Sequence, residues 1–339
     1  MGLIGKQTWE FKSQPVLVAS GAVVGPKEGA GPLGQEFDTV HPDNYIGQDS
    51  WEKAERRLFE EACLTALQKA NLQAQQIDVL YGGDLLNQIV TANFGARTLG
   101  TPFLGLFGAC STSMESLALA AMTVDAGFAT HALAATSSHN STAERQFRYP
   151  TEYGGQKPPT AQCTVTGSGA AIVGKSGNGP RITHATIGKV VDLGVKSPFE
   201  MGPAMAPAAV DTIARHFKDT GRTPDEYDLI ITGDLARVGH KIAEELFERE
   251  EGLFLGDRFK DCGILIFDPD QSEVFSGGSG CACCAVVTYG HLLKRMERGE
   301  LNRILVCATG ALLSPLSTQQ GESIPCVAHA VVIERGEWV

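Results

Sequence analysis

The chain has 339 residues, 43% of them hydrophobic, and its 28 Lys and Arg against 39 Asp and Glu give a net charge of −11. A chain of this length can bury a large core, and it predicts two domains or one large two-part domain. The negative charge would repel phosphate backbones and anionic lipid surfaces, so nucleic acid is excluded as an expected partner.

The N-terminus and the cysteines indicate the compartment. The chain does not begin with a charged stretch followed by an apolar one, and no apolar run approaches the length of a bilayer span. Nine cysteines, an odd number, lie mostly in apolar segments, as reduced thiols do. Cys281, Cys283 and Cys284 are crowded but lack the second pair that a zinc site needs. We expect a soluble intracellular protein, able to dock on membrane proteins, with no bound metal of its own.

The predicted elements of the first half alternate between strands and helices. A buried strand at 16–24 precedes a Gly- and Pro-rich loop to about residue 47, which is too long to be a simple connector. Asp49 and Glu52 resemble a capping box that begins a helix. The remaining expected elements are a strand at 77–82, a helix at 88–98, a buried strand at 103–107, a helix after residue 110, and strands at 131–136 and 163–174.

The second half repeats the scheme, so the halves 1–178 and 179–339 look like an internal duplication. The alternation predicts a mainly parallel sheet covered by helices. Residues 277–284 then correspond to residues 108–115, and the two helix N-termini are expected to converge on one pocket. The expected elements are strands at 182–191, 228–232, 303–309 and 326–334, and helices at 204–219, 237–249 and 281–299.

Cys110 is the most informative residue. It stands between a short apolar strand and an almost wholly apolar helix, so its thiol is expected to lie deep, at a helix N-terminus. The unpaired N–H groups and the positive dipole end at that position favour an anion. That anion is either the thiolate itself or the carboxylate of a bound ligand.

Four segments together resemble the thiolase-like superfamily, the ketoacyl synthases and thiolases, over nearly the whole chain: residues 108–113, 164–173, 277–280 and 308–312. The resemblance implies an α/β fold of two pseudo-duplicated halves in an α-β-α-β-α layering. It also implies a homodimer, paired through the strand that precedes Cys110.

A narrower resemblance is to thiolase-like proteins of spore-forming bacteria that bind dipicolinic acid during its uptake into the developing spore. It implies dipicolinic acid as ligand, alone or with Ca²⁺, and other membrane proteins of the spore uptake channel as partners. A peripheral location at the spore inner membrane is implied as well, and no cofactor is.

The residues that active members of the superfamily use beside the thiol are missing at their expected positions. Those enzymes need one His, and a second His or Asn, to handle the carbanion or leaving group. Asp234, after Thr232-Gly233, stands where the first His is expected, and Gly278 stands where the Asn is expected. His240 and His329 do not match the pattern. The losses predict a ligand-binding scaffold that has lost its catalysis.

The expected ligand site combines the two helix N-termini. The candidate charge partners of the ligand are Arg145 and Arg148, in the loop 137–159, which also carries His139, Tyr149 and Lys157. The alternative is that these side chains are solvated or paired across subunits. Asp234 is a second candidate, as an oxygen ligand for Ca²⁺. The candidate ligand-binding residues are Cys110, Ser111, Thr112, Arg145, Arg148, Asp234, Gly277, Gly278, Ser279 and Gly310.

Two alternatives remain open from the sequence. In the first, the chain is an active acyltransferase or condensing enzyme in which Cys110 is acylated from coenzyme A and His240, His139 or His329 is the base. In the second, it is an assembly partner whose pocket is vestigial. A buried Cys also serves as a small packing residue, so the thiol alone does not decide between them.

Overall fold

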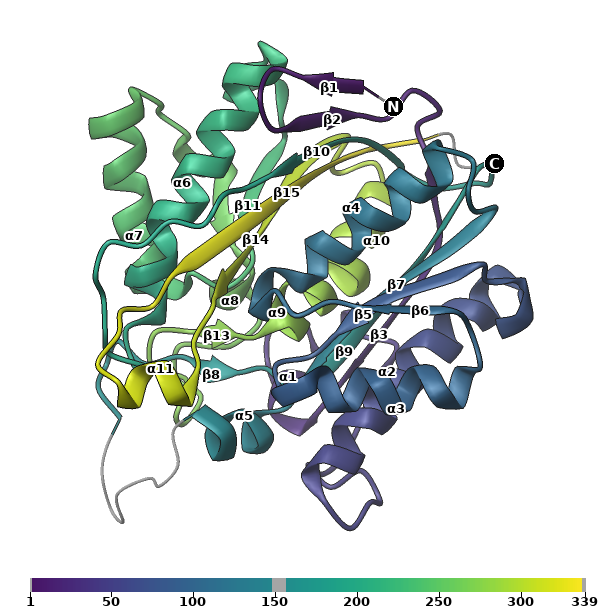
Figure 1. Ribbon diagram of the computed structural model, residues 1–339, viewed down its shortest axis with the longest axis horizontal. Coiled ribbons are helices and arrows are strands. Elements are labelled where there is room, and N and C mark those ends of the chain that lie inside the picture. The colour runs from purple at the N-terminus through teal and green to yellow at the C-terminus, as the bar shows by residue number, and fades with distance from the viewer. Residues whose placement is uncertain (1, 148–156, 337–339) are drawn as a thin grey trace.

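Ten strands run side by side through the molecule in the order β12-β11-β14-β15-β10-β3-β9-β7-β5-β6 (Figure 1). The computed structural model describes residues 2–147 and 157–336. The strands are β1 (Gly2–Ile4), β2 (Thr8–Glu10), β3 (Val16–Val24), β4 (Thr39–Val40), β5 (Val79–Gly83), β6 (Phe103–Gly105), β7 (His131–Ser138), β8 (Cys163–Thr164), β9 (Gly167–Gly174), β10 (Arg181–Ile187), β11 (Leu229–Thr232), β12 (Phe259–Asp261), β13 (Gly278–Ser279), β14 (Arg303–Ala311) and β15 (Cys326–Glu334).

The strands form two groups of five with the same order and the same directions. From its outer edge, one group reads β6-β5-β7-β9-β3 and the other reads β12-β11-β14-β15-β10. In both groups the two outer pairings are parallel and the two inner pairings are antiparallel. The groups meet where Val16 of β3 pairs with Arg181 of β10. This shared topology agrees with an internal duplication.

The expectation of a mainly parallel sheet was wrong for the inner strands. A helix between two strands forces a parallel crossover only when that helix packs on the face of the sheet. The helices α5 (Asn140–Phe147) and α11 (Pro315–Gln319) instead lie beyond the strand ends, so the chain turns back and the next strand runs antiparallel (Figure 1).

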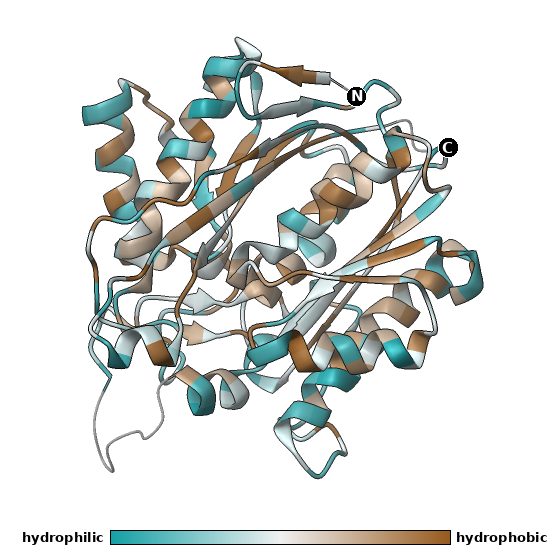
Figure 2. Cartoon of the chain, viewed as in Figure 1, coloured by the Kyte–Doolittle hydropathy of each residue, from teal (hydrophilic) through white to brown (hydrophobic). Residues whose placement is uncertain are grey.

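Helices cover the strands in three layers. The helices α4 (Thr112–Asp125) and α9 (Cys281–Val286) lie between the two groups of strands, and both are almost wholly buried (Figure 1). The figure coloured by hydropathy shows apolar residues along the strands and central helices and hydrophilic ones on the outer helices (Figure 2). The layering is therefore the expected α-β-α-β-α. The other helices are α1 (Pro26–Gly29), α2 (Trp51–Ala70), α3 (Val90–Leu99), α6 (Met201–Thr220), α7 (Ala236–Leu246), α8 (Cys262–Leu265) and α10 (Leu293–Glu297).

The outer helix α2 shows how the sequence pattern fixes this layering. Ala54, Leu58, Ala62 and Ala66 are fully buried and recur every four residues, which places them on one face of the helix. The helix begins after Ser50, whose hydroxyl accepts a hydrogen bond from the Lys53 amide at 3.4 Å. The expected cap at Asp49 was therefore displaced by one residue.

Strand β6, before Cys110, was expected to be buried and is not. Within the described residues it pairs with β5 alone. It ends at Gly105, and Leu104 is 54% exposed. Phe107, just after it, is 56% exposed. Apolar composition alone cannot distinguish a strand covered by its own chain from an edge strand that presents apolar side chains outward. Among the described residues no helix is long and apolar enough to cross a membrane.

A buried histidine helps to hold β10 to α6. His216 is fully buried, and its two ring nitrogens interact with Thr186 Oγ1 at 2.8 Å and with Tyr227 Oη at 2.6 Å. Burial lowers the pKa of His216 to about 3, with the nearby His184 and Arg222 acting in the same direction. The folded state therefore disfavours a proton that the unfolded chain binds with a pKa near 6.5.

The contribution of His216 to stability should depend on pH. Because its pKa is lowered by folding, the contribution is complete above about pH 6.5 and is lost as pH falls through about 3, at up to ~1.4 kcal/mol per pH unit. We expect the difference in unfolding free energy between the wild type and His216→Gln, measured by urea denaturation, to shrink across that window. A difference that stays constant with pH would contradict the buried neutral imidazole.

Candidate functional site

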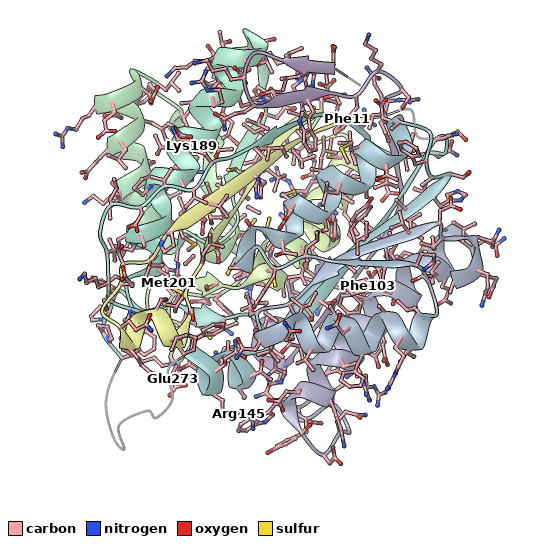
Figure 3. All side chains as sticks on the ribbon, viewed as in Figure 1. Phe11, Phe103, Arg145, Lys189, Met201 and Glu273 are labelled. Carbon is pink, nitrogen blue, oxygen red and sulfur yellow. The ribbon has the colours of Figure 1, made fainter. Side chains whose placement is uncertain are left out.

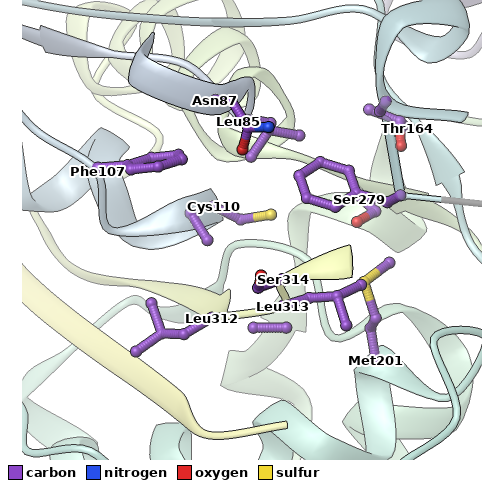
Figure 4. A pocket seen from close by; sticks show the side chains of 14 residues that line it. Leu85, Asn87, Phe107, Cys110, Thr164, Met201, Ser279, Leu312, Leu313 and Ser314 are labelled. Carbon is purple, nitrogen blue, oxygen red and sulfur yellow. The ribbon is translucent and has the colours of Figure 1, made fainter. Parts of the chain in front are cut away.

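A cavity of about 230 Å³ opens beside Cys110, between the two halves of the chain. The close view shows the Cys110 thiol pointing into it, with Phe107 on one side, Ser279 opposite and Leu312 and Leu313 below (Figure 4). The lining is mostly apolar, with a few hydroxyl and amide groups. The lining residues are Leu85, Asn87, Phe107, Ala109, Cys110, Ala143, Phe147, Thr164, Met201, Ser279, Ala311, Leu312, Leu313 and Ser314.

The turn that carries Cys110 is held in an unusual conformation. Ala109 has φ of +52°, a region that non-glycine residues rarely occupy, and Cys110 follows in a short 3₁₀ turn that leads directly into α4. The Gly108 amide donates to Thr112 Oγ1 at 3.1 Å, and the Ser111 hydroxyl donates to the Gly108 carbonyl at 2.7 Å. These bonds fix the turn, so the thiol faces the cavity from the start of a helix.

Gly310 of β14 packs directly against this turn. A Cβ added at Gly310 would lie 2.5 Å from the Gly108 carbonyl oxygen and 3.0 Å from the Ser111 nitrogen. Only a glycine permits this approach of the two backbones. Gly310 and Ser111 therefore support the cavity from behind, and neither is among its lining residues.

Asp234 lies near the Cys110 thiol and accepts hydrogen bonds from three other groups. Its Oδ1 accepts a hydrogen bond from Thr309 Oγ1 at 2.5 Å, and its Oδ2 accepts from the Gly280 amide at 3.1 Å and from Ser279 Oγ at 3.3 Å. The Cys110 thiol lies close enough for the carboxylate to act on it electrostatically. The side chain is 1% exposed. Asp234 thus joins the glycine-rich wall to β14, next to the start of α4.

This environment keeps Cys110 protonated. Burial is the main cause that raises the pKa of the Cys110 thiol well above its ordinary value, and the Asp234 carboxylate raises it further. Burial likewise raises the pKa of Asp234 to about 6, against the lowering effect of its hydrogen bonds. A thiol beside a carboxylate is not activated as a nucleophile, because the thiolate would bring two negative charges together. Of the two anions expected at this helix N-terminus, the thiolate is therefore disfavoured.

None of the three candidate histidine bases lines the cavity. His139 is fully buried, with Nε2 2.8 Å from the Asn44 carbonyl and Nδ1 accepting from the Ser141 amide at 3.1 Å. His240 stacks on Phe259, with ring centroids 4.3 Å apart, beside a different cavity. His329 accepts from the Gly188 amide at 3.3 Å, and burial lowers its pKa to about 4.

The candidate cations are placed elsewhere or lie outside the described residues. Arg145 forms an ion pair with Glu52 and lies over the Trp51 ring, 5.5 Å from its centroid, at the edge of the molecule (Figure 3). Lys157 pairs with Glu144 at 2.8 Å. Arg148, together with Tyr149, belongs to the segment that the structure does not describe. The described lining of the cavity accordingly contains no cationic side chain.

The glycine-rich wall stands opposite Cys110, as expected, but only Ser279 of it lines the cavity. Gly278 and Ser279 form β13, which pairs with Cys163 and Thr164 of β8. Gly277 and Gly278 are buried and do not line the cavity, and Thr112 is buried inside the Cys110 turn. Of the residues predicted for ligand contact, the structure therefore places Cys110 and Ser279 on the cavity surface.

Asp234 is not arranged as a calcium ligand, since donors from protein groups already occupy both of its oxygens. Across residues 2–147 and 157–336, no group of three or more His, Cys, Asp or Glu side chains is placed to hold a metal ion. The Ca²⁺ ligand role predicted for Asp234 thus finds no support in its contacts.

Sequence reasoning missed several lining residues, chiefly Asn87, Phe107, Phe147, Met201 and Ser314. One signal was available for Asn87, which follows strand β5 just as Cys110 follows β6. Parallel neighbouring strands bring their carboxyl ends to the same edge of a sheet. Met201 and Ser314 come from connections whose course depends on tertiary packing.

The Asp234 carboxylate should control the Cys110 thiol. In Asp234→Asn the new side-chain NH₂ group can face donors such as the Gly280 N–H, and two donors cannot form a hydrogen bond. We therefore expect a loss of ~1–3 kcal/mol in unfolding free energy. Removing the negative charge should also lower the pKa of Cys110, so iodoacetamide should alkylate Cys110 at a lower pH in the variant than in the wild type. Peptide mass spectrometry measures the extent of alkylation. Thr309→Val is the matched control, because it removes one hydrogen bond and keeps the charge. An unchanged alkylation profile in Asp234→Asn would contradict this arrangement.

Comparisons with known proteins agree on fold and family. The family model described as stage V sporulation protein AD matches residues 5–334. The stage V sporulation protein AD of Bacillus subtilis (strain 168) is 59% identical over 335 residues, covering 99% of this chain and 98% of that protein.

Solved condensing enzymes resemble the structure at low identity, which shows a thiolase-like fold. The 3-oxoacyl-[acyl-carrier-protein] synthase III of Aquifex aeolicus VF5 is 15% identical, with a TM-score of 0.58, covering 94% of this chain and 99% of that chain. A variant of OleA from Xanthomonas campestris is 15% identical, with a TM-score of 0.62, covering 98% and 100%. Fold, full-length match and sequence identity together show that the chain belongs to the stage V sporulation protein AD family.

Proposed function

We propose that this chain binds dipicolinic acid in the Cys110 cavity and passes it to membrane proteins of a spore uptake channel, without catalysing a reaction. The observation that carries the proposal is a formed cavity whose thiol is kept protonated by burial and further by Asp234, which stands where active relatives need a base. A catalytic cycle through an acylated cysteine requires an activated nucleophile and a proton acceptor. His139, His240 and His329 are all engaged away from the cavity.

The lining suits a small flat acid. Phe107 and Phe147 offer aromatic surface to a pyridine ring, and Asn87, Thr164, Ser279 and Ser314 offer polar groups to its carboxylates. The α4 N-terminus adds backbone N–H groups and a positive dipole end, which favour a carboxylate near Cys110.

Charge favours the calcium chelate over the free dianion. A ligand with two negative charges needs compensating cations when it leaves water, and the described lining supplies none. Dipicolinate that carries one Ca²⁺ has no net charge, so the same cavity can accept it without a paired Arg or Lys. The ion would enter with the ligand, and no protein site dedicated to it would be needed.

Calorimetric titration with dipicolinate, with and without Ca²⁺, tests the proposal. We expect saturable binding that is stronger with Ca²⁺ and at least about tenfold weaker in Cys110→Phe, because the larger side chain fills the cavity, whereas Cys110→Ser should bind nearly as the wild type does. Intact mass after incubation with acyl-coenzyme A should remain unchanged. A stable acyl adduct on Cys110 with no dipicolinate heat would contradict the proposal and favour an acyltransferase.

The proposal includes a homodimer formed through β6. This edge strand has β5 as its one partner in the described chain, and Phe94, Leu104 and Phe107 expose 42%, 54% and 56% of their surface beside it. A second copy that pairs with β6 would cover these side chains and satisfy the free backbone groups. Because Phe107 also lines the cavity, the second copy would lie at its mouth.

Sedimentation of the purified protein tests the dimer. We expect a dimer for the wild type and a shift toward monomer in Leu104→Lys, because the substitution places a charge in the apolar contact. Phe128→Lys is the matched control: Phe128 is 86% exposed in the turn between α4 and β7, outside β6, and its substitution should leave the dimer intact. A monomeric wild type, or a dimer insensitive to Leu104→Lys, would refute pairing through β6.

A further inference from the structure

A second cavity, of about 360 Å³, lies in the C-terminal half and involves none of the Cys110 cavity's lining residues. It is bounded by α7, the turn of π-helix at Phe247–Glu251, the loop 252–258, β12 and α8. Its lining residues are His240, Glu244, Phe247, Glu248, Leu253, Phe254, Leu255, Gly256, Asp257, Phe259, Lys260, Asp261, Ile264 and Leu265. We call these residues the α7 groove.

The walls of the α7 groove are apolar, and one aromatic side chain stands exposed at its mouth. Phe247 and Phe259 are each 1% exposed and pack edge to face, with ring centroids 5.4 Å apart. Phe254, in contrast, is 77% exposed. An exposed aromatic ring at the rim of an apolar hollow is typical of surfaces that receive an apolar side chain of a partner.

The rim of the α7 groove is acidic. Glu244, Glu248 and Asp257 line it together with a single cation, Lys260. Within the described part of the chain, Glu248 and Asp257 have no ion-pair partner. The neighbouring Arg258 forms an ion pair with Asp225 at 3.2 Å. Unneutralised carboxylates around an apolar hollow attract an apolar group that is flanked by positive charge.

We propose that the α7 groove docks a basic amphipathic segment of a protein partner, which inserts one apolar side chain beside Phe254 and places Lys or Arg near Glu248 and Asp257. The negative charge of the rim favours this basic segment over other classes of partner. Nucleic acid and anionic lipid would be repelled by the rim, and a second copy of this chain docked through the same groove would bring like charges together. Juxtamembrane segments of membrane proteins have the required chemistry, because they carry an excess of Lys and Arg.

The groove is connected to the ligand cavity through one buried carboxylate. Asp261, on the groove floor, accepts hydrogen bonds from Thr232 Oγ1 at 2.7 Å, the Leu235 amide at 2.8 Å and the Ala236 amide at 2.9 Å. These residues flank Asp234, which supports Cys110. A docked segment and a bound ligand would therefore contact opposite ends of the same short loop, while the docking proposal itself stands apart from the identity of the ligand.

Fluorescence anisotropy of a labelled peptide built from repeated Lys-Leu-Leu-Lys units tests the docking site. We expect saturable binding to the wild type and no comparable binding of the Glu-Leu-Leu-Glu counterpart. Phe254→Ser and the double variant Glu248→Lys with Asp257→Lys should each weaken binding of the basic peptide by at least about tenfold. Because all three positions are exposed, these variants are expected to fold.

Matched controls separate the groove from general attraction to an acidic protein. Phe128→Ser removes an equally exposed ring elsewhere, and Glu297→Lys with Glu322→Lys makes the same change in net charge at two exposed positions outside the groove. Both controls should bind as the wild type does. Equal weakening by groove and control variants would overturn the proposal, as would unchanged binding in Phe254→Ser. A Phe254→Ser variant that loses self-association in sedimentation would assign the groove to a second copy and overturn it as well.

Discussion

The hydrogen bonds around the buried carboxylate of Asp234 are the constraint on which the site depends. This side chain joins the glycine-rich wall, through Ser279 and Gly280, to β14, through Thr309, and it lies near Cys110 at the start of α4. A buried charged or polar group is stable only when its hydrogen bonds are satisfied, so these segments must keep their mutual positions. The cavity is the space that remains between them.

The same carboxylate affects the chemistry that the Cys110 thiol can perform. An imidazole beside a thiol can take its proton and stabilise the thiolate, whereas a carboxylate beside a thiol opposes ionisation. The turn geometry that presents Cys110 remains, with the positive φ of Ala109 and the close approach of Gly310. Selection for a shaped cavity accounts for this geometry as well as selection for catalysis does, because a ligand also needs a defined floor.

Much of this could be predicted from the sequence where local pattern and chemistry agree. The apolar runs at 16–24 and 326–334 are β3 and β15 as the structure has them, and Cys110 lies at a helix start facing a cavity. Asp234 was predicted to stand where active members of the resembling superfamily carry a His, and it proves to be buried near Cys110. What was missed depends on contacts between distant segments: the reversal of the inner strands, the exposure of β6, and the lining contributed by Asn87, Phe147 and Met201. Arg145 shows the limit most clearly, since its partner Glu52 belongs to an element that begins about ninety residues earlier in the chain.

A crystal structure of the protein grown with dipicolinate and Ca²⁺ tests the central claim most directly. The account predicts the ligand in the cavity beside Cys110, with a carboxylate near the start of α4, the calcium held mainly by the ligand, and the thiol unmodified near Asp234. A ligand bound elsewhere, with the Cys110 cavity empty or the thiol acylated, would contradict it.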